Sequence, residues 1–495
     1  MFRHMNTSRS ASAPLLIGWS RADLTPDQPV LISGQFHARR SEGVLDPITA
    51  TVLALDTGSD HALFVSCDLV VICDALRDAV RDWLNARKPE FDPLKVILHA
   101  THTHTAPECR KPEMGASHSS GPLGVELDPY LAPDGYLAFA AKRIADAILA
   151  AWQSRKPGDL LYGQGFAVIG RNRRWADESG VSTMYGNTDT PAFSHIEGYE
   201  DHSVNLMATR DAQGALTGLV VNVPCPSQAG ENGFQLSADY WHDTRAELRR
   251  RLGDPLFVLG QCSAAGDQSP HLLYDKSATA RMLELTGRSV RQEIAQRLSD
   301  AVEQTLRHIA KAPVQAPVLV HHVETLEIPL AVLTEADAER AGREAEASRL
   351  TYEEEMRKLE AHPELKKEPR WYVKATFAHR RMSWFKSVIM RYRTLKEKPT
   401  MPVEIHVIRL GDMVFASNPF EYYLDFGVHI KARSKAVQTF LVQLAGPGTY
   451  VPSRRSLAGG GYGSIPASNP VAAEGGWKLA RRTVAVIDSL FSSDV

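Results

Sequence analysis

Two histidines lie one residue apart in the segment HATHTHTAPE, which follows an apolar, strand-like run. Alternate residues of a β-strand point to the same face, so the spacing predicts that His102 and His104 lie side by side where the strand ends. Two neutral imidazole nitrogens on one face suit a zinc ion, which binds histidine at about 2.0–2.1 Å. Because the chain has 18 histidines, the alternative is a chance pair of polar side chains in a surface turn.

A second segment suited to catalysis is CSAAGDQSPH, in which small residues follow an apolar strand-like run. Gly266 permits close approach of the backbone, Asp267 can bond to nearby backbone amides, and Pro270 stiffens the loop. In such a loop the hydroxyl of Ser269 could act as a nucleophile or donate a hydrogen bond to a developing oxyanion. The alternative is a well-capped turn that contains an ordinary serine.

Three further side chains could belong to a catalytic site. The segment FASNPFEYYLDFG predicts a strand followed by a helix that carries Glu421 in its first turn. Glu421 is then a metal ligand or general base, or else a carboxylate that only stabilises the helix dipole. Tyr450 and Tyr462 lie in the glycine-rich segments GPGTYVPS and GGGYGS, from which a phenol can reach into a site or pack on the surface.

Alternating strand-like and helix-like patterns must position these side chains. Apolar runs rich in β-branched residues predict strands at 61–72, 95–104, 216–225 and 256–264. Amphipathic patterns predict helices at 75–87, 134–152, 240–253 and 289–310. The alternation is typical of an α/β body built from βα units, in which ligands bind beyond the carboxyl ends of strands.

Residues 334–400 differ in character from the rest of the chain. A charged, alanine-rich half and a basic, aromatic half predict a helical hairpin inserted into a catalytic domain of residues 14–495. The hairpin either covers the surface or, because its second half carries Trp384 and Phe385, acts as a lid, an oligomer arm or a contact for an anionic or lipidic partner. The polar residues 1–13 predict a flexible N-terminus.

The composition is that of a soluble globular protein that is long enough to carry a deep pocket. With 56 Lys and Arg against 58 Asp and Glu, the net charge of −2 gives no support for a nucleic-acid partner. Five cysteines in 495 residues are too few for a disulfide scaffold, and no run of apolar residues is long enough to span a membrane. No apolar segment of signal-peptide length follows the N-terminus, so we expect a cytoplasmic protein. The oligomeric state is left open.

Segments along most of the chain resemble, in order, those of the neutral/alkaline, non-lysosomal ceramidase family. These segments are IGWSRADLTP, DPITATVLALDTG, ALFVSCDLV, HATHTHTAP, GRNRRW, AAGDQSP, SNPFEYY and GPGTYVPS with GGGYG. The resemblance implies an α/β fold of mixed, twisted sheets flanked by helices, together with zinc-dependent hydrolysis of an amide bond.

The resemblance also implies roles for individual residues. His102, Glu421 and Tyr450 would bind zinc, and His104 would act on the substrate beside the metal. Ser269 would lie close to the scissile carbonyl, and Arg171 or Arg173 would bind polar groups of the substrate. The remaining candidate residues are Asp267 and Tyr462 for catalysis, and Asp239 and His242 for substrate binding.

The sequence departs from the family pattern at one expected zinc ligand. The segment VNVPCPSQAGENGFQLSADY has Pro226 where the second zinc histidine is expected, although SADY is kept. Cys225, Gln228 or His242 could substitute, and a Cys225 thiolate is the best metal ligand of the three.

The sequence departs from the family pattern in two further ways. We expect it to be too short for the extra β-sandwich-like domain that ceramidases carry, and we find no signal peptide. Both departures favour a substrate other than ceramide. Polar loop residues suit a sugar or a small amide. We therefore expect a zinc-dependent hydrolase of an N-acyl amide. One alternative is hydrolysis of a glycosidic or ester bond in a carbohydrate, with Asp239 and Glu421 as paired carboxylates. The other is a metal-free, non-catalytic homologue that binds a ligand.

Overall fold

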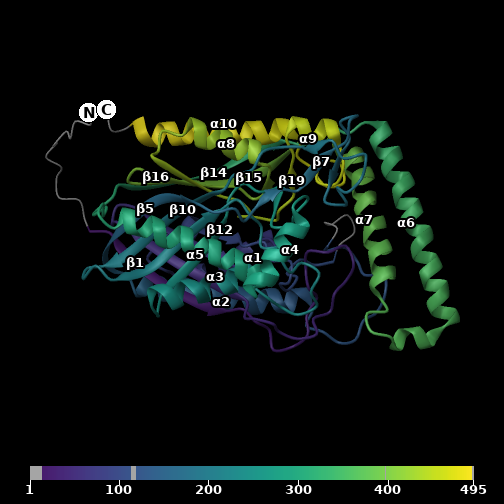
Figure 1. Ribbon diagram of the computed structural model, residues 1–495, viewed down its shortest axis with the longest axis horizontal. Coiled ribbons are helices and arrows are strands. Elements are labelled where there is room, and N and C mark those ends of the chain that lie inside the picture. Colours follow the sequence, from purple (N-terminus) through teal and green to yellow (C-terminus); the bar gives the residue numbers. More distant parts are fainter. Residues whose placement is uncertain (1–13, 113–118, 396, 493–495) are drawn as a thin grey trace.

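An eight-stranded mixed sheet runs through the centre of the computed structural model, which describes residues 14–112, 119–395 and 397–492 (Figure 1). Its strands lie in the order β12 (Phe257–Cys262), β11 (Leu216–Val223), β10 (Ser203–Asp211), β5 (Lys156–Phe166), β1 (Leu16–Asp23), β2 (Thr49–Asp56), β3 (His61–Cys67) and β4 (Val96–Ala100). The neighbours β3–β4 and β11–β12 are parallel, and the other neighbours in this order are antiparallel.

Helices cover one face of this sheet. They are α1 (Asp74–Arg87), α2 (Pro133–Gln153), α3 (Tyr240–Leu252) and α5 (Val290–Ile309). The predicted βα units therefore exist at β3–α1–β4 and β11–α3–β12, where a helix links two parallel neighbours. The other expected units are replaced by antiparallel pairs, because alternation along the chain does not determine which strands become neighbours.

A second, four-stranded sheet packs on the opposite face of the first. Its strands lie in the order β14 (Leu319–Pro329), β15 (Thr400–Leu410), β16 (Met413–Ser417) and β18 (Gln438–Val442). Phe415 stacks on Phe440 at 4.3 Å between ring centroids and meets Phe64 of the first sheet at 4.9 Å. Helices α8 (Leu424–Arg433) and α10 (Ala473–Ser492) cover the outer face, so the body has four layers: helices, sheet, sheet and helices (Figure 1).

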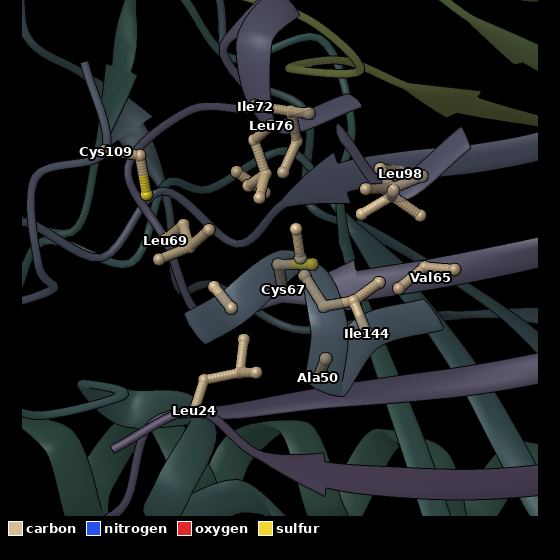
Figure 2. Close-up of a cluster of buried hydrophobic side chains, with 14 of the residues drawn as sticks. Leu24, Ala50, Val65, Cys67, Leu69, Ile72, Leu76, Leu98, Cys109 and Ile144 are labelled. Atoms are coloured by element: carbon tan, nitrogen blue, oxygen red, sulfur yellow. The ribbon is translucent and has the colours of Figure 1, made fainter. Parts of the chain in front are cut away.

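The core between the first sheet and its helices is apolar. Figure 2 shows Val65 and Cys67 of β3, Leu98 of β4, Leu76 of α1 and Ile144 of α2 together in this layer. On α1 the buried residues recur every four positions, which is the periodicity of one helix face. Mixed sheets flanked by helices are the fold class that the sequence predicts, and the structure confirms it.

The sequence range 334–400 contains two long helices, α6 (Glu335–Ala361) and α7 (Val373–Thr394), with a short 3₁₀ turn, η2 (Pro363–Lys367), between them. Thr334 and Asp337 form a reciprocal capping box that begins α6. Figure 1 shows this hairpin standing at one end of the layers. Its apolar face includes Ala341, Ala345 and Val388, and this face packs against Tyr462 and Ile465 of the body.

Shorter elements complete the described chain. They are β6 (Arg171–Asn172), β7 (Arg174–Ala176), β8 (Ser182–Met184), β9 (His195–Ile196), β13 (Gln268–Ser269), β17 (Glu421–Tyr422), β19 (Tyr450–Val451), η1 (Pro93–Lys95), α4 (Lys276–Thr286) and α9 (Arg454–Gly459). None of the helices in the described ranges has the length and apolar character needed to cross a membrane. The predicted flexible N-terminus, residues 1–13, lies outside the described residues.

Candidate active site

His102 and His104 face each other, although not in the way that strand alternation predicts. Strand β4 ends at Ala100, and His102 follows it with a left-handed backbone conformation, at φ 67°. This conformation is strained for a side chain with a Cβ atom, and the His102 amide is held there by a hydrogen bond of 3.0 Å to the Leu69 carbonyl. The Nε2 atoms of the two histidines are 3.3 Å apart.

Glu421 lies against His102 on a short strand. Helix α8 begins only at Leu424, so the prediction that Glu421 occupies the first turn of a helix is wrong. Strand β17 instead pairs in parallel with β19, which places Glu421 opposite Tyr450. A Cβ atom at Gly266 would stand 2.4 Å from the Glu421 carbonyl oxygen, so the glycine predicted to allow close backbone approach does so here.

The protonation pattern of this pair follows from its contacts. The Nδ1 atom of His102 lies 2.6 Å from the Val70 carbonyl, which can only accept, so Nδ1 carries a proton and Nε2 faces Glu421. That Nε2 atom is 3.4 Å from Oε2 of Glu421. Burial by itself raises the pKa of Glu421. Contacts with His102, Arg173 and the Tyr450 phenol outweigh the burial, so the pKa lies below its ordinary value and the carboxylate stays ionised.

A completely buried guanidinium organises the residues behind this pair. Arg173 donates to the Tyr185 hydroxyl at 2.6 Å and to the Tyr450 hydroxyl at 3.2 Å. It also donates to the Gln228 side-chain carbonyl at 3.2 Å and lies 3.6 Å from the Glu421 carboxylate. Because four polar side chains share one fixed fork of donors, Arg173 sets their relative positions.

The two arginines proposed for substrate binding are separated in the structure. Arg171 donates to the Tyr274 hydroxyl at 2.7 Å in a partly exposed position away from His102. Arg173 lies close to the histidine–glutamate pair but does not itself line the cavity in front of that pair.

Two residues that hold His104 come from the loop after β11. The Gln228 amide nitrogen is 2.6 Å from Nε2 of His104, and Glu231 Oε2 is 3.5 Å from its Nδ1. The other oxygen of Glu231 is 3.1 Å from Nε2 of His271. Sequence analysis named Gln228 but missed Glu231, whose only signal is an acidic residue in a loop beyond the carboxyl end of a strand.

Replacing Glu231 with glutamine is expected to lower kcat about 10- to 100-fold, because an outer partner that orients a reactive histidine has an effect of this size. Steady-state kinetics on the purified variant would measure the effect. The exposed neighbour Asn232 provides a control, since Asn232→Ala removes a side chain of the same loop. Equal losses in the two variants would show that the loop, and not the carboxylate, is responsible.

Ser269 and Asp267 lie beside this cluster and hold the loop in place. The Ser269 hydroxyl accepts from the His271 backbone amide at 3.1 Å and from the Tyr185 hydroxyl at 3.5 Å. The Asp267 carboxylate accepts from the Leu424 backbone amide at 2.9 Å, which ties the loop to the start of α8. Neither residue is among those that line the cavity, so their contacts position neighbours.

The carboxyl of Asp267 should make stability depend on pH. Burial raises its pKa to about 6. The unfolded chain has an ordinary value of about 3.9, so the stabilising contribution of the protonated form is complete below that value and is lost as pH rises through about 6. The free energy of unfolding of the native protein minus that of Asp267→Asn should fall by about 2 kcal/mol between pH 4 and 7. Urea unfolding of both proteins across this range tests the sign, and a constant difference would contradict it.

Three predicted residues lie outside the cluster. Asp239 accepts backbone hydrogen bonds from Ala229, Gly230 and Tyr240 at 2.6–3.1 Å, so its carboxylate holds a loop and begins α3. Cys225 is buried with its thiol against the Pro226 carbonyl, and burial raises the pKa of this thiol well above its usual range. His242 is partly exposed and lies 3.9 Å from Asp46.

A cavity of about 180 Å³ opens in front of His102, His104 and Glu421. Its wall includes the phenols Tyr450 and Tyr462, whose rings meet at right angles with centroids 5.5 Å apart. Burial raises the pKa of both phenols far above neutrality, so each keeps its proton.

Whether zinc could bind depends on the side chains around the cavity that can coordinate a metal ion. In the described ranges, no three His, Cys, Asp or Glu side chains come together in a group that could hold a metal. His102 and Glu421 are nevertheless 3.4 Å apart, and two ligands of one tetrahedral zinc ion stand about 3.4 Å apart. Tyr450, which lies opposite Glu421 in the β17–β19 pair, would be the third donor and would leave one position of a tetrahedral ion open. Cys225 is not among the residues around this cavity.

Solved structures with this arrangement of elements are known. The crystal structure of neutral ceramidase from Pseudomonas aeruginosa matches with a TM-score of 0.65 and 17% sequence identity, over 96% of this chain and 74% of that chain. The fold is that of neutral ceramidase. A ceramidase complexed with C2 gives the same TM-score and coverage at 16% identity. Comparison with protein-family models and with curated proteins gives no match. The likeness to neutral ceramidase therefore establishes the fold, which the ordered sequence segments predicted.

Proposed function

We propose that this protein is a ceramidase-like hydrolase that cleaves an N-acyl amide bond. The observation that carries the proposal is the convergence of His102, Glu421 and Tyr450 at one cavity, with His104 beside them. These side chains come from three distant parts of the sequence and bring together an imidazole, an ionised carboxylate and a neutral phenol. The ceramidase-like fold adds support, because the same kind of body carries the activity in proteins of that name.

The side chains around the cavity would have different roles in amide hydrolysis. Tyr462 presents a protonated phenol to the cavity and is placed to donate to the oxygen of a developing tetrahedral intermediate. His104, held by Gln228 and Glu231, is the group to take a proton and return it to the leaving amine.

His102, Glu421 and Tyr450 would hold the zinc ion. Zinc, when bound, supplies a Lewis acid and lowers the pKa of a coordinated water toward neutrality. The positive charge of Arg173, 3.6 Å from Glu421, opposes a cation at this position. We therefore expect weaker zinc binding than at a site with four protein ligands.

The size of the cavity favours a small substrate over ceramide. At about 180 Å³ it is smaller than the roughly 300–1,000 Å³ of ordinary ligand pockets. A short N-acyl group fits this space, whereas the two long hydrocarbon chains of a ceramide would have to extend beyond it. Glycosidic hydrolysis has less support, because it needs two available carboxylates and Asp239 is already bonded to three backbone amides.

The proposal is tested by measuring metal content and substrate range together. Elemental mass spectrometry of the purified protein, before and after chelator treatment, should give about one zinc per chain. A panel of short N-acyl amides, long-chain ceramides and aryl glycosides should show turnover of the short amides, with loss after chelation. Turnover of glycosides alone would replace the amide proposal, and a lack of both metal and turnover would favour a ligand-binding homologue.

A further inference from the structure

Helix α7 supplies part of the wall of the active-site cavity. Trp384, Ser387 and Arg391 recur at intervals of three and four residues, which places them on one face of the helix. All three line the cavity that contains His102 and Glu421. The hairpin at one end of the molecule in Figure 1 is therefore part of the site and not only a surface feature.

Arg391 brings an uncompensated positive charge to this wall. Its guanidinium donates to the backbone carbonyls of Pro466 and Asn469, the latter at 3.4 Å. Within the part of the chain that the structure describes, no carboxylate forms an ion pair with it. Burial lowers the pKa of Arg391 to about 10, which still leaves the side chain charged at neutral pH.

The other arginine that lines the cavity differs from Arg391 in this respect. Arg110 pairs with the buried Glu108 carboxylate at 2.7 Å, so its charge is balanced within the protein. The Glu421 carboxylate already faces His102 and Arg173. A half-buried guanidinium that is bonded only to neutral carbonyls keeps an unbalanced positive charge, so an anion would bind to it favourably. The planar guanidinium can donate two parallel hydrogen bonds, which match the two oxygens of a carboxylate.

We propose that the substrate is a small amide that carries a carboxylate, of the N-acyl amino acid class, and that Arg391 binds this carboxylate. This inference rests on the proposed amide hydrolysis and adds the chemical class of the substrate. The backbone carbonyls of Pro466 and Asn469 fix the guanidinium, and the indole of Trp384, two turns away on the same helix, forms another part of the cavity wall.

The experiment compares N-acetylglycine with the neutral N-acetylglycinamide by following acetate release. Wild-type protein should favour N-acetylglycine in kcat/KM by about 10- to 100-fold, the size expected for hydrogen bonds to a charged group. Arg391→Met should bring the ratio of the two kcat/KM values close to one, and Arg391→Lys should keep part of the preference. The matched control is Arg381→Met on the same helix, where the partly exposed arginine pairs with Glu344 outside the cavity. This control should leave the ratio as it is.

A binding measurement separates this inference from the proposed function. Titration calorimetry of N-acetylglycine should show binding to wild-type protein that is at least about 10-fold weaker for Arg391→Met. If both amides are hydrolysed at equal rates by the wild type, the carboxylate inference is overturned while amide hydrolysis stands. If neither amide is hydrolysed but N-acetylglycine binds in an Arg391-dependent manner, the hydrolase proposal fails and the anion site stands. Equal binding of the acid to Arg391→Met and wild type also overturns the inference.

Discussion

Replacing Glu421 with glutamine is expected to reduce kcat/KM for amide hydrolysis by roughly 1,000-fold or more, a loss typical of a group in direct contact with the reacting atoms. The amide keeps the size of the side chain but removes the negative charge that lies 3.4 Å from His102. The backbone pairing of β17 with β19 does not depend on the carboxylate, so the fold should persist. If zinc binds at this position, the glutamine variant should also contain less zinc than the wild type.

Steady-state kinetics and elemental mass spectrometry on the same preparations measure both effects. Glu474→Gln is a suitable control, because Glu474 is 63% exposed and lies far along the sequence on α10. Activity of Glu421→Gln within about 10-fold of wild type would remove Glu421 from the proposed mechanism. A circular dichroism spectrum identical to wild type would show that a large loss is not due to unfolding.

Replacing Arg173 with methionine is expected to lower the free energy of unfolding by about 3–5 kcal/mol, the cost of breaking a buried ion pair by removing one partner. The side chain is 1% exposed, and its loss leaves Glu421 without its cation and removes the 2.8 Å hydrogen bond that Arg173 donates to the Gly266 carbonyl. Activity should fall as well, because Tyr450 loses the hydrogen bond that positions it.

Urea unfolding with fluorescence detection measures this destabilisation. Arg171→Met is the matched control from the same short segment, because its side chain is 25% exposed and should contribute less than about 1 kcal/mol. Arg173→Lys distinguishes charge from shape, since lysine keeps the charge but cannot serve several acceptors with one planar fork. A similar effect of Arg171→Met and Arg173→Met would contradict the role assigned to Arg173.

Local patterns in the sequence determined most of the secondary structure. Amphipathic spacing placed α1, α3 and α5 within a residue or two of their observed ends, and apolar runs located the strands β3, β4, β11 and β12. These patterns are informative because each helix or strand buries one face, and the period of apolar residues follows directly from the geometry of the element. The ordered segments also predicted the ceramidase-like fold, and with it the importance of the region around His102 and Glu421.

The tertiary structure alone decided which side chains meet. Glu421 faces His102 because the two-residue strands β17 and β19 pair with each other, although no local pattern encodes that pairing. Gly266 adds to this placement, because it lets its own loop approach the Glu421 backbone. Glu231 lies in a loop without a recognisable motif. Arg391 lies on a helix whose pattern predicted a surface hairpin, a lid, an oligomer arm or a contact for an anionic or lipidic partner, but not a place in the wall of the active-site cavity. The periodicity of apolar residues along a helix or strand predicts which residues are buried. The composition of an active site depends instead on strand pairing and helix packing, which bring segments that are distant in the sequence to one cavity. The role proposed for Arg391 follows only from the tertiary structure, which places its charge at the cavity with no ion-pair partner among the described residues.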